Sequence, residues 1–136
     1  GADCAEDFSI KESETIEPGM VLVVAQDGLL QPSKKAYDKR VVGVVSGAGD
    51  YKPGIVLGKK HSRSKRVPVA LTGRGYCEVD AHYAPIEVCD LLTTSPTPGH
   101  AMKANDSLKA FGAVIGKALY PLKNGTGLIP IFVALQ

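Results

Sequence analysis

The sequence contains no tryptophan, and only 6% of its 136 residues are aromatic. Proteins that hold glycans commonly use flat aromatic side chains as platforms, because these rings offer a large apolar face with a polar edge. Five tyrosines without a tryptophan make a carbohydrate-binding module a less attractive interpretation. Glycan or surface binding by the polar loops at 47–52 and 59–65 therefore stays the second alternative.

Long hydrophobic runs and paired cysteines are also missing. The longest apolar stretches, such as residues 20–25, are far shorter than the roughly 20 residues that a membrane-spanning helix needs, so no membrane span is expected. Cys4, Cys77 and Cys89 are odd in number and widely spaced, which fits neither a disulfide framework nor a zinc-binding knuckle. We expect them to be small buried hydrophobic residues.

The charge is nearly balanced, with a formal net charge of +2. Nucleic-acid-binding domains usually carry a strongly basic face, so we expect no nucleic-acid partner. The chain begins with Gly1 and has no basic segment followed by an apolar one, so we expect it to be a fragment of a longer polypeptide. Its location, in a virion or a bacterium and possibly at a cell surface, is therefore not encoded here.

Glycine and proline, in contrast, are abundant and closely spaced, with 15 and 9 copies. They interrupt helices, and β-branched residues fill the gaps, so the sequence predicts a single all-β domain over residues 1–136. Asp27-Gly28 predicts a tight hairpin turn between the first strand and residues 29–31. The predicted strands are 20–25, 40–46, 54–57, 67–72, 76–79, 90–93, 101–103, 113–118 and 128–135.

One pattern occurs twice after the N-terminal segment 1–15. The halves 16–72 and 73–136 each contain a similar apolar strand, then a turn, an apolar strand with an internal glycine and a strand with a proline. Glycine or proline inside a strand marks a bulge or an edge. We therefore predict a small barrel or β-clip-like fold of two pseudo-repeated halves. The aligned segments are 16–24 with 86–94, 41–45 with 114–118, and 67–71 with 129–135.

Two strands, 40–46 and 128–135, are apolar almost throughout instead of alternating. Such strands are typical of positions where both faces are covered. A domain of this size has little material to cover both, so we expect burial against other copies of the chain in a closed symmetric oligomer. The alternative is a two-layer sandwich with these strands at its centre.

The common catalytic signatures are missing, since no phosphate loop, zinc ligand pair or nucleophile elbow occurs, and we expect no metal and no cofactor. The basic run 59–66 could attract phosphate or an acidic surface, but a solvated hairpin tip is the preferred interpretation. Glu78, Asp80 and His82 could share one side of an extended chain as an acid/base cluster. A polar outer face would produce the same pattern.

A pair of carboxylates stands at the start of the chain, where Asp3 and Glu6 are three residues apart. If the two side chains converge, repulsion and desolvation separate their pKa values and leave one as an acid and one as a base. Such a pair could cleave a neighbouring peptide bond. Acidic residues before a strand are common, so this spacing alone has low specificity.

Three segments resemble a known family. Residues 1–8 (GADCAEDF), residues 19–24 with their Asp27-Gly28 turn, and residues 40–47 (RVVGVVSG) resemble the autoproteolytic C-terminal domain of podophage neck-appendage proteins. They also resemble a broader set of phage and bacterial tail-fibre C-terminal domains. The first third of the chain carries the resemblance to the appendage domain, and the remainder matches the broader set only.

The resemblance implies an intramolecular chaperone of the glutamic-peptidase type that drives trimerisation of a fibre and then removes itself by self-cleavage. The family motif A-D-x-A-E maps its catalytic residues onto Asp3 and Glu6 and its scissile bond onto Ala2–Asp3. Two features depart from the family: only Phe8 remains of an aromatic stretch, and Gly1 and Ala2 are still attached.

The leading hypothesis is thus a structural assembly domain, whose partners are other copies of itself, in a homotrimer, and the upstream fibre or parent polypeptide. A self-cleaving peptidase as the main role is the first alternative.

Overall fold

The computed structural model describes residues 3–10, 15–49, 53–57 and 66–136, and of residue 3 and residues 53–57 it describes the backbone alone. These residues form an almost entirely β structure, as the glycine and proline content predicted. Its one described helix is α1, a single turn at Ser107–Ala110. The strands are β1 (Asp3–Ser9), β2 (Val21–Val24), β3 (Leu30–Pro32), β4 (Val41–Val45), β5 (Pro53–Leu57), β6 (Arg66–Asp80), β7 (Leu91–Thr94), β8 (Ala101–Lys103), β9 (Val114–Ala118) and β10 (Thr126–Ala134).

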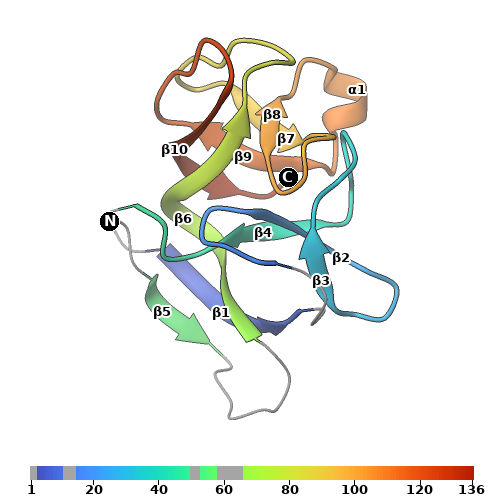
Figure 1. The fold of residues 1–136 in the computed structure, drawn as a ribbon, viewed down its shortest axis with the longest axis vertical. Helices are drawn as coiled ribbons and strands as arrows, with labels where there is room; N and C mark the ends of the chain where they lie inside the picture. The colour runs from blue at the N-terminus through green and yellow to red at the C-terminus, as the bar shows by residue number, and fades with distance from the viewer. Residues whose placement is uncertain (1–2, 11–14, 50–52, 58–65) are drawn as a thin grey trace.

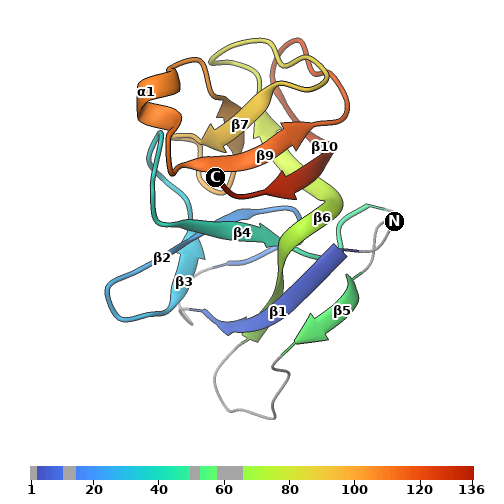
Figure 2. The same ribbon diagram turned by 180° about the vertical axis from the view of Figure 1, so that it is seen from behind.

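A long strand, β6, connects a five-stranded barrel to a second group of strands, which includes β1 and β4 (Figure 1). Its second half pairs with β10 from Thr72 to Asp80 and touches β8 at Val79. Together with β9 and β7, these strands close a five-stranded barrel in the order β10-β9-β7-β8-β6. The first half of β6 leaves the barrel and pairs with β1 and β4. Figure 2 shows β1 and β5 side by side at the end of β6 opposite the barrel.

The strand triplets β2–β3–β4 and β7–β8–β9 have the same pairing. In each, the first strand pairs antiparallel with the other two, and the register shifts after Leu22 in one triplet and after Leu92 in the other. Leu22 lies opposite Gly43, and Leu92 lies opposite Gly116. These are the positions that the repeated sequence pattern aligns, so the bulges and their glycines occur at matching places.

The turn after β2 differs in detail from the prediction. The hairpin is present, since β2 and β3 pair from Leu22–Pro32 to Val24–Leu30. Gly28 has a φ of 82°, whereas Asp27 is not in the left-handed region, so the two-residue primed turn expected for Asp-Gly does not form. The Gly28 N–H instead donates to the Ala25 carbonyl at 2.9 Å, which gives a wider turn that ends in a left-handed glycine.

Two apolar clusters stabilise these parts. The larger fills the barrel and extends to β2 and β4, and the smaller lies between β1, β2, β3, β4 and the first half of β6. Strand β4 is covered on both faces within its own chain, because four of its five residues are buried and Val42 is half-buried. For β4, the chain supplies its own cover and the expectation of cover by a second copy is wrong.

Candidate functional site

The outer face of β10 carries a row of apolar side chains. Ile129, Ile131 and Val133 point into the barrel and are almost completely buried. Because side chains alternate along a strand, Leu128, Pro130 and Phe132 point outward. Leu128 keeps 39% and Phe132 keeps 43% of its surface exposed. We call these three residues the β10 outer face.

Charged residues of the neighbouring strands lie at opposite ends of this face. Phe132 pairs with Arg74 of β6 and Lys117 of β9, whereas Leu128 pairs with Glu78 of β6. The face is therefore apolar in the middle, basic at one end and acidic at the other. Apolar cores with polar rims are typical of protein–protein interfaces.

The predicted acid pair lies in β1, which is paired with β5 on one side and β6 on the other. Asp3 pairs through its backbone with Pro53 of β5, and Glu6 pairs with Leu57 and Val69. The pairing register shifts between Asp3 and Cys4 against β5, and between Cys4 and Ala5 against β6. Glu6 is half-buried. The Asp3 side chain and Ala2 lie outside the described residues, so the convergence of the two carboxylates stays a prediction.

The polar residues at the end of β6 form a network with the turn that follows β7. Asp80 is buried and accepts hydrogen bonds from the Thr97 hydroxyl at 2.7 Å and from the His82 backbone N–H at 2.8 Å. Glu78 Oε2 lies 3.4 Å from His100 Nε2, which is an ion pair when the imidazole is protonated. The sequence placed Glu78, Asp80 and His82 together but gave no sign of Thr97 and His100, which are distant along the chain.

This network tethers two segments and leaves Asp80 ionised. Burial by itself raises the pKa of Asp80, but the hydrogen bonds from Thr97 and the His82 N–H and the charges of His82 and His100 outweigh it, so the pKa lies below its usual value. A carboxylate held in its charged form by hydrogen bonds is a poor proton acceptor. The arrangement therefore supports a structural role and not an acid/base site.

Most of the basic run 59–66 lies outside the described residues, as does part of loop 47–52. Arg66 is described, and its Nη2 donates to the Asp7 carbonyl at 2.9 Å, which joins β6 to β1. Glycan or surface binding by these two loops thus stays a prediction.

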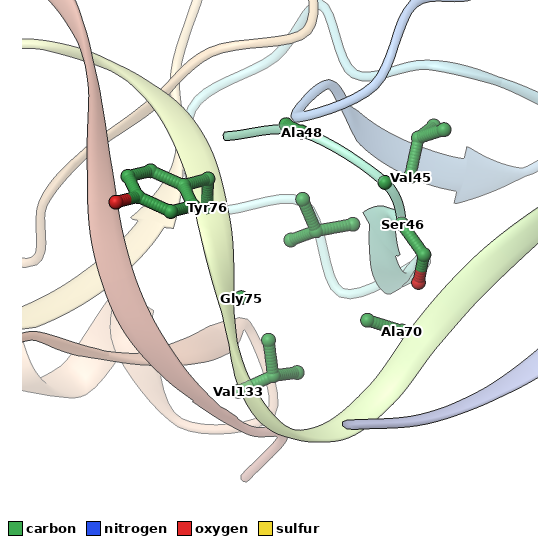
Figure 3. A pocket seen from close by; sticks show the side chains of 9 residues that line it. Val45, Ser46, Ala48, Ala70, Gly75, Tyr76 and Val133 are labelled. Atoms are coloured by element: carbon green, nitrogen blue, oxygen red, sulfur yellow. The ribbon is translucent and has the colours of Figure 1, made fainter. Parts of the chain in front are cut away.

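A small hollow lies where the end of β4 approaches β6 and the end of β10. It is lined by the residues labelled in Figure 3 and has a volume of about 10 Å³. That is about the space of one water molecule, so no organic ligand fits. The Tyr76 ring bounds one side, and its hydroxyl points away from the hollow (Figure 3).

The three cysteines differ in environment. All are free thiols; Cys77 is buried, Cys4 is half-buried and Cys89 is exposed with a φ of 73°. The prediction of buried cysteines is thus right for Cys77 and wrong for Cys89. In the described part of the chain, no group of three or more His, Cys, Asp or Glu side chains is arranged to hold a metal ion. No helix among those residues is long and apolar enough to span a membrane.

Comparisons with known proteins find similarity in structure alone. No protein-family model matches the sequence, and no curated protein sequence matches it significantly. The C-terminal fragment of bacteriophage phi29 gene product 12 is similar, with a TM-score of 0.68 and 15% identity over 97% of this chain and all of that one.

Two further phi29 structures are similar. Pre-mature gene product 12 matches with a TM-score of 0.65 and 14% identity over 98% of this chain, which spans only 21% of that protein. The N base of head fiber gp8.5 matches with a TM-score of 0.50 and 17% identity over 94% of this chain and 92% of that one. The fold implied by the sequence resemblance to phage appendage C-terminal domains is therefore confirmed, since this chain shares its fold with the C-terminal fragment of phi29 gene product 12.

Proposed function

We propose that this chain is a structural assembly domain that forms a homotrimeric cap at the C-terminal end of a phage fibre-like or bacterial surface protein. The exposed apolar β10 outer face is the observation that carries the proposal. The shared fold with a phage protein's C-terminal fragment supports the same assignment. The partners are two further copies of the chain and the parent polypeptide upstream.

The physical reason is the cost of leaving this face in water. Fully burying a Leu or Phe side chain contributes about 1.5–3 kcal/mol, and Leu128 and Phe132 each retain about 40% of that surface. Their burial alone is too little for a stable complex, which typically buries about 800 Å² on each partner. The acidic and basic ends supply further contacts, because Glu78 of one copy can approach Arg74 or Lys117 of the next. A closed ring then leaves no apolar face open.

A substitution at the centre of the β10 outer face tests the proposal. Phe132→Ser removes the largest exposed side chain of the face and should convert the trimer to monomer at micromolar concentration, measured by sedimentation velocity. The matched control is Phe111→Ser, because Phe111 is even more exposed, at 81%, but follows α1 outside this face. A trimer that persists in Phe132→Ser, or that is lost equally in both variants, contradicts the assignment of this face.

Self-cleavage is a second candidate function, favoured by the motif at Asp3 and Glu6 and by the existence of both a pre-mature protein and a C-terminal fragment among the similar structures. In this reaction one carboxylate removes a proton from water, which attacks the carbonyl carbon of Ala2. The other carboxylic acid protonates the amide nitrogen of Asp3 as the bond breaks. The products are a carboxylate at Ala2 and a new N-terminus at Asp3, and no cofactor is consumed.

Expression of the domain with a longer upstream segment tests this chemistry. We expect a fragment that begins at Asp3, identified by intact mass, and we expect Glu6→Ala to reduce its formation by at least about 100-fold, the usual scale for loss of an acid/base group. Glu17→Ala, an exposed acidic residue outside the motif, is the control. Cleavage that continues in Glu6→Ala would show that Glu6 has no catalytic role.

A further inference from the structure

An open hollow beside α1 is lined by three lysines that come from distant segments. Lys35 and Lys39 lie between β3 and β4, and Lys109 lies in α1. The hollow has a volume of about 510 Å³, within the range of ligand sites in proteins. The carbons of the Lys39 side chain lie beside Gly112, which follows α1, so the two segments are in contact here. Tyr37 and the 90% exposed Leu108 add an apolar part to the lining.

The positive charge of this hollow is only partly offset by nearby acids, since the charge of Lys35 acts on the Asp38 carboxylate and is one of the causes that lower its pKa. No ion pair joins Lys35, Lys39 or Lys109 to a carboxylate among the described residues. Two acids are near, but both are engaged. Asp38 accepts from Nε and Nη2 of Arg40 at 3.1 and 2.9 Å, and Asp106 accepts from the backbone N–H groups of residues 108 and 109. Three lysines therefore line one space, and their combined charge favours an anion there.

The segment that carries two of these lysines is held in a fixed and costly conformation. Tyr37 has a φ of 54°, in the left-handed region that residues other than glycine rarely adopt. Its hydroxyl oxygen accepts the Asp106 N–H at 3.0 Å, and its own N–H donates to the Thr94 carbonyl at 3.2 Å. The next N–H, of Asp38, donates to the Thr94 hydroxyl at 2.7 Å. Backbone strain kept by surrounding contacts is typical of functional sites.

We propose that this hollow binds a phosphate group that carries a small ring or apolar substituent. Lysine is an established ligand of phosphate, which it binds as a point charge, and the fork of nearby Arg40 is already occupied by Asp38. A phosphate monoester carries about −1.5 to −2 charges at neutral pH, which two or three ammonium groups match. Tyr37 and Leu108 provide the apolar surface for the substituent, and the proton of the Tyr37 hydroxyl is available to the anion because its oxygen already accepts.

The proposal is tested by titrating the protein with defined probes and following the backbone amide shifts by NMR. Titration with phenyl phosphate should give saturable shifts confined to residues 35–39 and 107–112, and phenol at the same concentrations should give none. Dimethyl phosphate is a third probe. Binding of phenyl phosphate alone assigns a terminal phosphate as the natural ligand group, and binding of dimethyl phosphate as well assigns a bridging phosphate diester.

Two double variants that each remove two positive charges distinguish binding at the hollow from a general attraction of phosphate to the positively charged protein. Lys35→Gln/Lys109→Gln should raise the apparent dissociation constant for phenyl phosphate by at least about tenfold, because each ammonium–phosphate contact is charge-assisted. Lys103→Gln/Lys123→Gln removes two lysines outside both the hollow and the β10 outer face, and should change it less than twofold. Shifts that do not saturate, that lie outside the hollow, or that weaken equally in both double variants would overturn the proposal.

Discussion

At the scale of single residues, Asp80 belongs to a polar pattern in the sequence and has a structural role, because its hydrogen bonds join two turns. Its carboxylate lies at the C-terminal end of β6 and accepts hydrogen bonds from the turn that follows β7 and from the turn that follows β6. The Thr97 hydroxyl is also hydrogen-bonded to the Tyr83 hydroxyl, with an oxygen–oxygen distance of 2.8 Å. Asp80 therefore joins the ends of two barrel strands through Thr97.

Removal of the Asp80 charge should destabilise the domain in a pH-dependent way. The folded-state pKa of Asp80 lies below its unfolded value, so its contribution is present at neutral pH and is lost as the pH falls through the lowered folded pKa. Asp80→Asn should lower the free energy of unfolding at pH 7 by about 1–3 kcal/mol, because the amide keeps one acceptor oxygen, so that one of the two donors, Thr97 or His82, faces an NH2 group instead of an acceptor. The measurement is urea denaturation between pH 7 and pH 2.

The difference between Asp80→Asn and the original chain should shrink below about pH 4, where the unfolded carboxyl also becomes protonated. Glu87→Gln, at an exposed position, is the control and should have little effect. A pH-independent difference for Asp80→Asn would contradict the ionised state assigned to this carboxyl.

The sequence predicted only part of this network. Period-two alternation placed Glu78, Asp80 and His82 on one side of a strand, and Glu78 and Asp80 do both engage the turn after β7. Their partners Thr97 and His100 are close only because β8 pairs with β6 at Val79–Ala101. A single parallel pairing between segments about twenty residues apart leaves no periodic signal, so local patterns could not predict it.

At the scale of elements, two glycines control how closely the strands approach. A Cβ at Gly43 would collide with the Ala70 carbonyl of β6, and a Cβ at Gly116 would collide with the Phe132 carbonyl of β10. Both contacts involve backbone, which cannot rotate aside as a side chain can. The repeated apolar strands with an internal glycine therefore reflect the same requirement in β4 and in β9.

Gly116→Ala should destabilise the barrel strongly. We expect a loss of about 3 kcal/mol, at the upper end for overpacking, because β9 and β10 must separate. Gly125→Ala is the control, because Gly125 has a left-handed backbone, with a φ of 67°, but has open space around it. This substitution should cost only about 1 kcal/mol, for the left-handed backbone alone. Thermal unfolding followed by circular dichroism compares them. Equal losses in the two variants would contradict the role of close strand approach.

The sequence predicted most strands to within two residues but misread three elements. Residues 67–72 and 76–79 are parts of one strand, β6, because Gly73, with a φ of 98°, bends the strand without ending its pairing to β10. Strand β1 escaped prediction, since DCAEDFS lacks an alternating apolar pattern and its order comes from pairing with β5 and β6. The turn α1 follows the N-cap Asp106, a signal too short to predict a helix.

At the scale of the whole molecule, the two continuously apolar strands have different outcomes. Strand β4 lies between β2 and β6 and is covered by the smaller and larger apolar clusters of its own chain. Strand β10 has one face in the barrel, whereas Leu128 and Phe132 on its outer face keep 39% and 43% of their surface exposed. The apolar run in the sequence thus predicted burial correctly for β4, whereas for β10 cover by a second copy stays a prediction.

The mass of the purified chain in solution tests this account most directly. Sedimentation equilibrium at concentrations from about 1 to 100 μM should give a species of three times the 14.3 kDa chain mass, with the Phe132 and Leu128 side chains protected from solvent in the complex. A folded 14.3 kDa monomer across the whole concentration range would contradict the proposed assembly and leave the β10 outer face without its assigned partner.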